Sequence, residues 1–355
     1  MDNKILDDDF LIRNFNVEEY FNKYNSIITQ EIYESVGGFL KKISEDKDRL
    51  YLFSLRGIGD FLIAGGLSYA VQKRKNKKST VLVISDKKYD LRVLFPNVTG
   101  FIKLSGDDIP KFTAYFEWTA NYEGDNYICA SFQKHNDQYL WDENLNMLDR
   151  FKKDALKIPI DTPFVYPIID EISAESAAEI NEQYILDKER TIILLSYANS
   201  FKKTLNKEFW LKMAQRLKEK NYIVYTNVAG EEQPIEGTEP FKVSFNELYY
   251  VTDKVKCFIG LRSGVLDFLA MTDAKILNIT PFPYWYWDIS VMFPECNNRT
   301  FYDTTGYTDV INKILNEYDV SIDNINYAHE KIALENIFYS HDEILSAILS
   351  EVEKI

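Results

Sequence analysis

Short apolar runs alternate with longer helical stretches along most of the chain, and this alternation predicts strands and helices in turn. In the first half, Leu50–Leu55 and Thr80–Ser85 are predicted strands, and residues 58–72 between them are a predicted apolar helix. A strand, a glycine turn, a helix and a second strand make a βαβ unit, which implies a parallel sheet covered on both faces. The apolar runs Gly100–Leu104 and Tyr127–Ala130 extend this predicted sheet.

The same alternation restarts more clearly in the second half. Four strands are predicted over Thr191–Leu195, Tyr222–Thr226, Val255–Ile259 and Lys275–Ile279. The helices between them are predicted over Lys207–Lys220, Phe245–Val251 and Val265–Met271. One side of the first of these helices is apolar, as is typical of a helix packed on a sheet. The pattern therefore predicts a second, doubly wound α/β domain.

Three closely spaced prolines, Pro159, Pro163 and Pro167, separate the two halves and indicate a linker. We therefore predict one Rossmann-like domain over residues 1–165 and another over residues 166–330. The chain from about Asp309 is predicted to be mostly helical, and residues 331–355 form a C-terminal helix for which packing back on the first domain is one arrangement. Ligands of such sheets bind outside the carboxyl ends of the strands, so the loops that follow the strands are expected to build the site.

The composition is that of a globular protein with a strong acidic excess. Of the 355 residues, 46% are hydrophobic and 27% charged, and the formal net charge is −14. Such a chain is a poor non-specific partner for nucleic acid, because the phosphates would repel it. The one dense basic run is Lys73–Lys78, which is interpreted either as a solvated helix end or as a docking patch for phosphates at a membrane surface.

Cysteine usage and the N-terminal sequence predict a reducing compartment. The three cysteines, Cys129, Cys257 and Cys296, are widely spaced and odd in number, which fits neither a disulfide framework nor a metal site. The acidic N-terminus has no apolar signal segment, and no apolar run approaches the roughly 18–20 residues that cross a bilayer. We expect a cytoplasmic protein, with peripheral association at the inner face of the membrane as the alternative.

The segment around Arg262 carries the clearest candidate chemistry. A predicted buried strand ends, Arg262, Ser263 and Gly264 form a tight turn, and a helix begins at once. Free N–H groups at the helix start, close backbone approach at the glycine and the guanidinium fork are suited to a diphosphate. The alternative is an ordinary turn in which Ser263 caps the helix and Arg262 pairs with a carboxylate.

A glycine-rich turn occupies the corresponding strand end of the first half. Arg56, Gly57 and Gly59 lead to Asp60 at the predicted start of a helix. This GxG is too short for a dinucleotide fingerprint. Asp60 is interpreted either as a helix cap or as a general base that faces the cleft and takes a proton from an acceptor hydroxyl.

Polar side chains also follow the first two strands of the second half. The residues suited to phosphate or ribose oxygens are Ser196, Asn199, Lys202 and Lys203 after the first strand, and Asn227 and Glu231 after the second. Ordinary solvated loops have the same composition, so the sequence does not separate that alternative from a ligand-binding role. The aromatic run Pro281–Asp288 follows a later strand, and either stacks on a base or sugar or folds its aromatic rings against its own domain.

Taken together, Thr191–Asn227 and Val255–Ala270 resemble the donor-binding half of the GT-B glycosyltransferases, especially the heptosyltransferase-like enzymes of glycosyltransferase family 9. Gly59-Asp60 resembles the glycine-rich turn of their first domain. The resemblance implies a GT-B-like α/β fold, with two Rossmann-like doubly wound domains facing a cleft and a helical C-terminal tail. The first domain would bind the acceptor and the second the nucleotide-sugar donor.

The resemblance also implies an activity. It is inverting transfer from a nucleotide diphosphate sugar to a hydroxyl of a glycan, lipid-linked or protein acceptor in bacterial polysaccharide or glycoconjugate assembly, without an obligatory metal or other cofactor. Asp60 matches the proposed catalytic base of the family. The phosphate-binding positions are matched by Lys202 or Lys203, Arg262, Ser263 and Gly264, and the ribose-binding acid by Glu231.

Two departures from the family pattern bear on the donor. Heptosyltransferases usually have an acidic residue before the Thr/Ser-Gly and a histidine shortly after, where this chain has Arg262 and Asp267. We predict that both of these residues bind the donor. These departures argue against ADP-heptose and leave a hexosyl or related donor. The other functions that remain open are a nucleotide-sugar epimerase and a catalytically silent GT-B subunit that binds a partner transferase.

Overall fold

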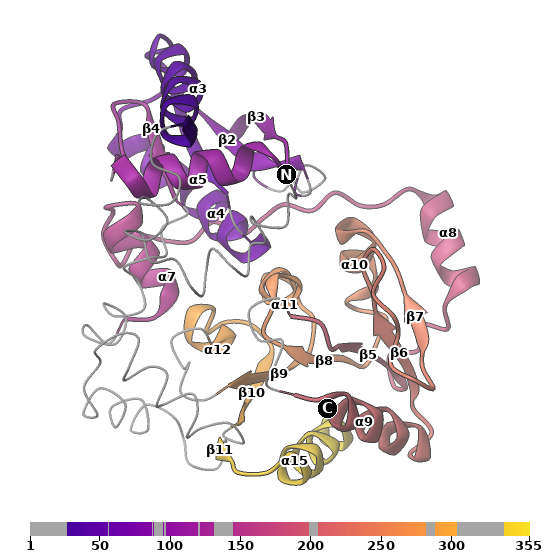
Figure 1. Cartoon of the computed structure of the whole chain (residues 1–355). Coiled ribbons are helices and arrows are strands. Elements are labelled where there is room, and N and C mark those ends of the chain that lie inside the picture. The colour runs from indigo at the N-terminus through magenta and orange to yellow at the C-terminus, as the bar shows by residue number, and fades with distance from the viewer. Residues whose placement is uncertain are drawn as a thin grey trace.

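Two parallel β-sheets, one in each half of the chain, organise the molecule (Figure 1). The computed structural model describes residues 27–55, 57–86, 88, 95, 97–119, 121–130, 145–198, 205–281, 288–303 and 337–355. The statements below concern these residues. The sheets confirm the predicted α/β class, because every strand pair within them is parallel.

The first sheet has the strand order β3-β2-β1-β4. Its strands are β1 (Arg49–Ser54), β2 (Ser79–Ser85), β3 (Val98–Leu104) and β4 (Tyr127–Cys129). Successive side chains of β1 point to opposite faces. Tyr51 and Phe53 pack with helices α3 (Ile27–Ser44) and α5 (Asp108–Thr119), and Leu50 and Leu52 pack with α4 (Ile58–Arg74). Both faces of the sheet are therefore covered, as the apolar strands predict.

The second sheet has seven strands in the order β11-β10-β9-β8-β5-β6-β7. In chain order the strands are β5 (Thr191–Leu195), β6 (Ile223–Asn227), β7 (Glu239–Phe241), β8 (Cys257–Leu261), β9 (Ile276–Pro281), β10 (Asn298–Asp303) and β11 (Ile337–Phe338). One face packs with α9 (Lys207–Glu219) and α15 (His341–Lys354). The other packs with α10 (Phe245–Val251), α11 (Gly264–Leu269) and α12 (Ile289–Met292).

The remaining described helices lie on the path between the two sheets. They are α7 (Met147–Arg150), the π-helix η3 (Phe151–Ala155) and α8 (Ala174–Gln183). An extended segment over residues 162–173, which holds two of the three linker prolines, leads from η3 to α8 (Figure 1). The domain limits at residues 165 and 330 themselves stay a prediction.

Each strand and helix predicted in the two alternating halves is present, with ends shifted by no more than two residues. β7, β10 and β11 escaped prediction. β7 is three residues long and contains Pro240, and β10 begins with the polar residues Asn298 and Arg299. Short or polar-flanked strands give no apolar run, so only their neighbours in the sheet reveal them.

The C-terminal prediction needs correction. β11 lies in the predicted tail, and α15 packs on the second sheet instead of the first domain: Ile344 and Ile348 share a core with Phe209 and Met213 of α9. A complementary apolar side on α9 explains this placement. Residues 304–336 of the predicted helical tail lie outside the described residues.

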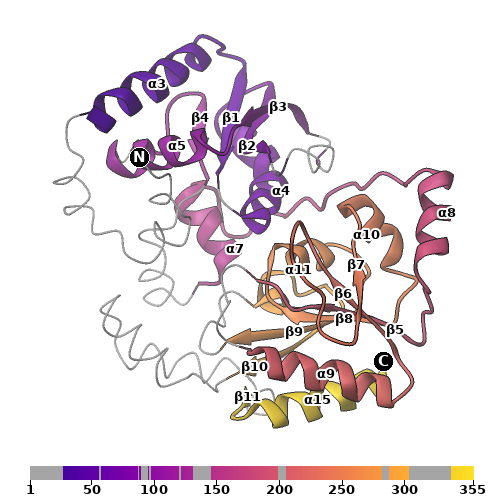
Figure 2. The same ribbon diagram turned by 45° about the vertical axis from the view of Figure 1, so that its right-hand side comes forward.

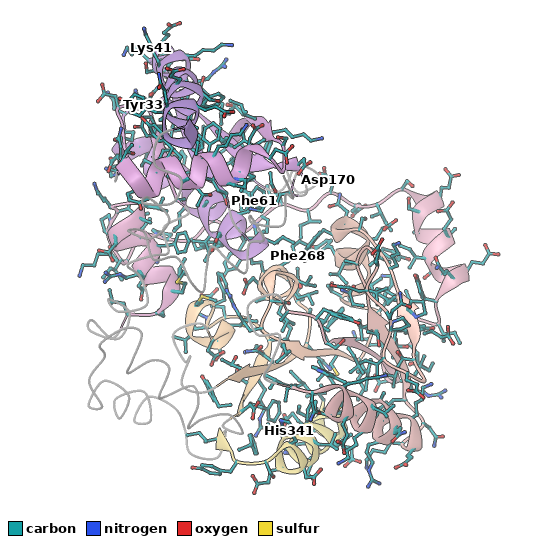
Figure 3. All side chains as sticks on the ribbon, viewed as in Figure 1. Tyr33, Lys41, Phe61, Asp170, Phe268 and His341 are labelled. Carbon is teal, nitrogen blue, oxygen red and sulfur yellow. The ribbon has the colours of Figure 1, made fainter. Side chains whose placement is uncertain are left out.

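An apolar core continues across the two halves. Phe61 of α4 and Phe268 of α11 are both fully buried and belong to one cluster, which also contains residues of both sheets (Figure 3). Phe164 of the linker adds a second bridge: its ring lies against Gly66 of α4 and 5.3 Å, centroid to centroid, from that of Phe293. The two domains therefore share buried apolar surface, which favours a fixed arrangement.

Two glycines let the domains meet backbone to backbone, where α4 faces α11 (Figure 2). A Cβ atom on Gly264 would lie 2.7 Å from Cβ of Ile58 and 3.2 Å from the Gly59 nitrogen. A Cβ atom on Gly59 would lie 2.1 Å from Oδ2 of Asp267. A larger residue at Gly264 would press on backbone of the first domain, and one at Gly59 would displace the Asp267 carboxylate.

The basic run Lys73–Lys78 is engaged within its own domain. Arg74 and Lys75 pair with Glu123 at 2.8 and 2.5 Å, and Lys78 pairs with Asp48 at 2.9 Å. Lys73 lies over the Tyr69 ring. These contacts favour the interpretation of the run as a helix end that packs locally, with Glu123 at its centre.

We expect Gly264→Ala to lower the free energy of unfolding by about 1–3 kcal/mol, because the added methyl overpacks a contact that includes backbone. Thermal and urea unfolding measure this. Gly57→Ala is the matched control: a Cβ atom there meets nothing within 4 Å and φ is −60°. Equal losses in the two variants would contradict the proposed steric constraint.

Glu123 provides a pH-dependent prediction. Although burial alone would raise the pKa of Glu123, hydrogen bonds from Lys157, Lys75 and Arg74 lower it to about 2. A carboxyl with a lowered folded-state pKa stabilises the fold above its unfolded value of about 4.3, and this contribution fades as the pH falls toward 2.

Glu123→Gln should therefore cost about 2 kcal/mol at pH 7, and the difference from wild type should shrink between pH 4 and pH 2. Urea unfolding at several pH values checks both. Glu219→Gln is the control, because Glu219 pairs with Arg216 only at the exposed surface. A pH-independent difference would contradict the ion-pair explanation.

Candidate active site

The candidate site lies where each sheet changes its winding direction. In the first sheet β2 and β4 flank β1, and in the second β6 and β8 flank β5. The chain therefore leaves β1 and β5 toward one side and returns on the other, which creates a switch point at their carboxyl ends, the usual position of ligands in such sheets. In the second sheet β8 lies at the centre, beside β5.

The two switch points face each other. Gly59, at the start of the helix after β1, and Gly264, at the start of the helix after β8, lie in contact across the two domains. Topology therefore brings together two predicted site segments that are about 200 residues apart in the chain.

Three charged side chains are buried at this contact: Asp60 is 9%, Arg262 6% and Asp267 2% exposed. Asp60 lies in the first turn of α4 and Asp267 in the first turn of α11. Nη2 of Arg262 donates to Oδ2 of Asp267 at 2.9 Å. Oδ1 of Asp267 is buried and makes no hydrogen bond with the described residues.

The pKa of Asp267 reflects both its burial and its charged neighbours. Burial raises the pKa of Asp267 to about 6, although the Arg262 guanidinium acts in the opposite direction, and the Asp60 charge adds to the rise. Asp60 and Asp267 are like charges in a buried place, and their repulsion favours the protonated form of Asp267.

The turn after β8 has the features of the capping alternative. Ser263 caps α11, since its Oγ accepts a hydrogen bond from the Leu266 nitrogen at 3.5 Å. The Arg262 guanidinium is turned to Asp267, and Ile58 and Gly59 of the other domain cover Gly264. In this arrangement the first domain occupies the place where we predicted a diphosphate.

The loops after β5 and β6 are linked to each other. The Tyr197 hydroxyl donates to the Gln233 carbonyl at 2.7 Å. Ser196, directly after β5, is half-buried, and its Oγ is buried without a hydrogen-bond partner among the described residues. Asn227 ends β6 and is half-buried, whereas Glu231 is fully on the surface. Ser196 and Asn227 therefore end neighbouring strands near the switch point.

Several predicted site residues lie outside the described residues: Arg56, Asn199, Lys202, Lys203 and positions 282–287 of the aromatic run. Asp288 at the end of that run is described and 1% exposed. Its Oδ1 accepts from the Thr300 hydroxyl at 2.6 Å, and its Oδ2 accepts from the Tyr302 hydroxyl. This buried network fixes the chain where the aromatic run ends.

Sequence reasoning missed one buried cation near the site. Lys88, beyond the end of β2, is 4% exposed, and its Nζ donates to the Ser54 carbonyl at 3.2 Å, at the carboxyl end of β1. The signal available was the run Asp86-Lys87-Lys88 directly after a predicted strand. A single lysine in a polar run does not reveal burial, which here depends on the neighbouring strand.

Searches for a metal site and for membrane spans give no candidate in the described part of the chain. Its His, Cys, Asp and Glu residues form no group of three or more that could hold a metal ion. None of its helices is both long and apolar enough to cross a membrane.

No protein-family model matches the sequence, and no curated protein matches it. Solved structures do match its fold. A glycosyl transferase family 9 protein from Veillonella parvula DSM 2008 has a TM-score of 0.55 over 87% of this chain and 98% of its own, at 11% identity. The ADP-heptose lps heptosyltransferase II of E. coli has a TM-score of 0.49 over 76% and 99%, at 12% identity. The first likeness shows that this chain has a GT-B-like fold: two facing parallel α/β sheets and a C-terminal helix.

Proposed function

We propose that the chain is a glycosyltransferase that moves a sugar from a nucleotide diphosphate sugar to an acceptor hydroxyl with inversion at the anomeric carbon. The observation that carries the proposal is the position of Asp60. Its buried carboxylate lies at the carboxyl edge of the first sheet, where the turns after β1 and β8 meet. In a GT-B-like fold a base at this place can reach an acceptor held by one domain and a donor held by the other.

In the proposed reaction, Asp60 removes the proton from the acceptor hydroxyl as that oxygen attacks the anomeric carbon. The new carbon–oxygen bond forms as the bond from the anomeric carbon to the phosphate oxygen breaks, and the nucleotide diphosphate leaves with the bonding electrons. Attack opposite to the leaving group inverts the anomeric configuration. Burial of Asp60 excludes water that would compete as acceptor.

The second domain would hold the donor at the switch point beside β5. Ser196 is the best-supported contact, because its buried Oγ has no hydrogen-bond partner among the described residues and lies directly after β5. Asn227 and Glu231 follow the neighbouring strand and suit ribose hydroxyls. Asn199, Lys202 and Lys203 remain proposed phosphate ligands, and Ser263 and Gly264 remain proposed backbone contacts of the donor.

The structure gives Arg262 and Asp267 less support as donor ligands than Ser196, because their side chains pair with each other at 2.9 Å. This pairing also favours a second candidate function, a GT-B protein that binds nucleotide sugar or a partner transferase without transferring sugar. Hydrolysis or transfer of a bound donor distinguishes these candidates experimentally.

A thermal-shift screen against UDP-, GDP-, ADP- and CMP-sugars tests donor binding, since a ligand of the native state raises the melting temperature with occupancy. Slow hydrolysis of the donor that binds, measured as release of nucleotide diphosphate, would support the transferase. Donor binding without hydrolysis or transfer to any glycan would support the silent protein. We expect a hexosyl or related donor.

Asp60→Asn should reduce kcat about 10²–10⁴-fold, the usual contribution of a general base, and leave the donor-induced thermal shift unchanged. Initial rates and melting temperatures measure the two effects. Asp108→Asn is the matched control, because Asp108 also lies in the first turn of a helix of the first domain but is exposed to solvent. Full activity of the Asp60 variant would exclude this assignment of the base.

A further inference from the structure

Arg262 and Asp267 form a buried ion pair on the second-domain side of the domain contact. Their side chains are 8% and 3% exposed, and Nη2 and Oδ2 are 2.9 Å apart. A buried ion pair stabilises a fold only weakly, since removing two charges from water opposes their attraction. A role in positioning neighbouring groups therefore explains this pair better than a contribution to stability.

The pair is held rigidly by its own domain. The Arg262 nitrogen donates to the Ile279 carbonyl of β9 at 3.3 Å, and the Asp267 nitrogen donates to the Ser263 carbonyl at 2.9 Å. Ser263 caps the helix that carries Asp267. These hydrogen bonds fix the backbone at both residues, and the hydrogen bond between the side chains joins the guanidinium to the carboxylate.

The turn of the first domain rests on this pair. A Cβ atom added to Gly59 would lie 2.1 Å from Oδ2 of Asp267 and 3.5 Å from Nη2 of Arg262. The backbone of Gly59 therefore packs directly on the bonded atoms of the pair. Asp60 is the next residue along the chain, so a shift of Gly59 moves the Asp60 carboxylate as well.

We propose that Arg262 and Asp267 are positioning residues: paired with each other, they form the surface on which Gly59 rests, and so fix where the Asp60 carboxylate lies relative to the second domain. The inference rests on the proposed role of Asp60 as the base. The sequence predicted that Arg262 and Asp267 bind the donor. The inference gives them a structural role in place of donor binding.

The charges at the domain contact are consistent with a positioning role for Arg262 and Asp267. Among the described residues, the charged groups that act on Asp267 are Arg262 and Asp60, one cation and one anion. Arg262 compensates part of the repulsion between the two carboxylates, which lets both lie in the same buried place. Without the cation, the Asp60 turn would be pushed away from the second domain.

Asp267→Asn keeps the shape of the side chain and removes its charge. We expect kcat to fall about 10–100-fold while the KM for the donor changes less than about twofold, because a misplaced base slows the chemical step but not donor binding. The amide of Phe61, which donates to the Gly57 carbonyl at 3.2 Å, should exchange with solvent faster.

If the single variant does not fold, the double variant Arg262→Gln with Asp267→Asn still tests the inference. It removes both charges of the pair together, so neither is left buried opposite an uncharged partner, and the two amides can bond to each other. We expect this variant to fold and still to lose kcat. Glu123→Gln is the control: it also removes ion pairs of a carboxylate, but at the far end of α4, and should keep kcat and Phe61 exchange at wild-type values.

The outcomes separate this inference from the proposed function. A rise in donor KM with unchanged kcat would overturn it and return the pair to donor binding. Unchanged kcat, KM and Phe61 exchange in the folded double variant would also overturn it. If no donor supports transfer by the wild type, the proposed function fails, and the exchange measurement then decides alone whether the pair positions the turn.

Discussion

The close contact between two glycine-bearing turns is the constraint on which the rest of the site depends. Gly59 of the first domain and Gly264 of the second leave no room for a side chain between them. Backbone at this distance brings together the carboxyl edges of the two sheets, and with them Asp60, Arg262 and Asp267. The continuous apolar core that contains Phe61 and Phe268 stabilises the arrangement from one side.

Burying three charges at this contact requires that they compensate one another. Arg262 and Asp267 do so through a direct bond, and Asp60 lies close enough to influence the pKa of Asp267. Such clusters are found at functional sites more often than elsewhere, because catalysis needs groups whose proton affinity is perturbed. The same pairing withdraws Arg262 from the open surface, which moves the proposed donor contacts toward Ser196 and the switch point beside β5.

The alternation of apolar runs was enough to predict the strands and helices of both Rossmann-like halves, since a strand buried on both faces has to be apolar throughout. Thr191–Leu195 and Phe245–Val251 have the predicted bounds. The pattern failed where burial is partial: β10 starts with polar residues, and β7 and β11 are too short to form a run. The position of β8 at the centre of its sheet also escaped, because strand order is not encoded in local periodicity.

The sequence by itself determined the fold class, the glycine turns and the residue types at the strand ends, because these follow from local hydrophobicity and backbone requirements. Only the tertiary structure decided which of these residues meet. Arg262 has the same chemistry whether it holds a phosphate or a carboxylate. Its partner is Asp267 because Arg262 lies directly before α11 and Asp267 lies in the first turn of that helix, and Gly59 of the other domain lies against both side chains. Contacts between residues about 200 positions apart depend on how two sheets pack, and no local pattern carries that information.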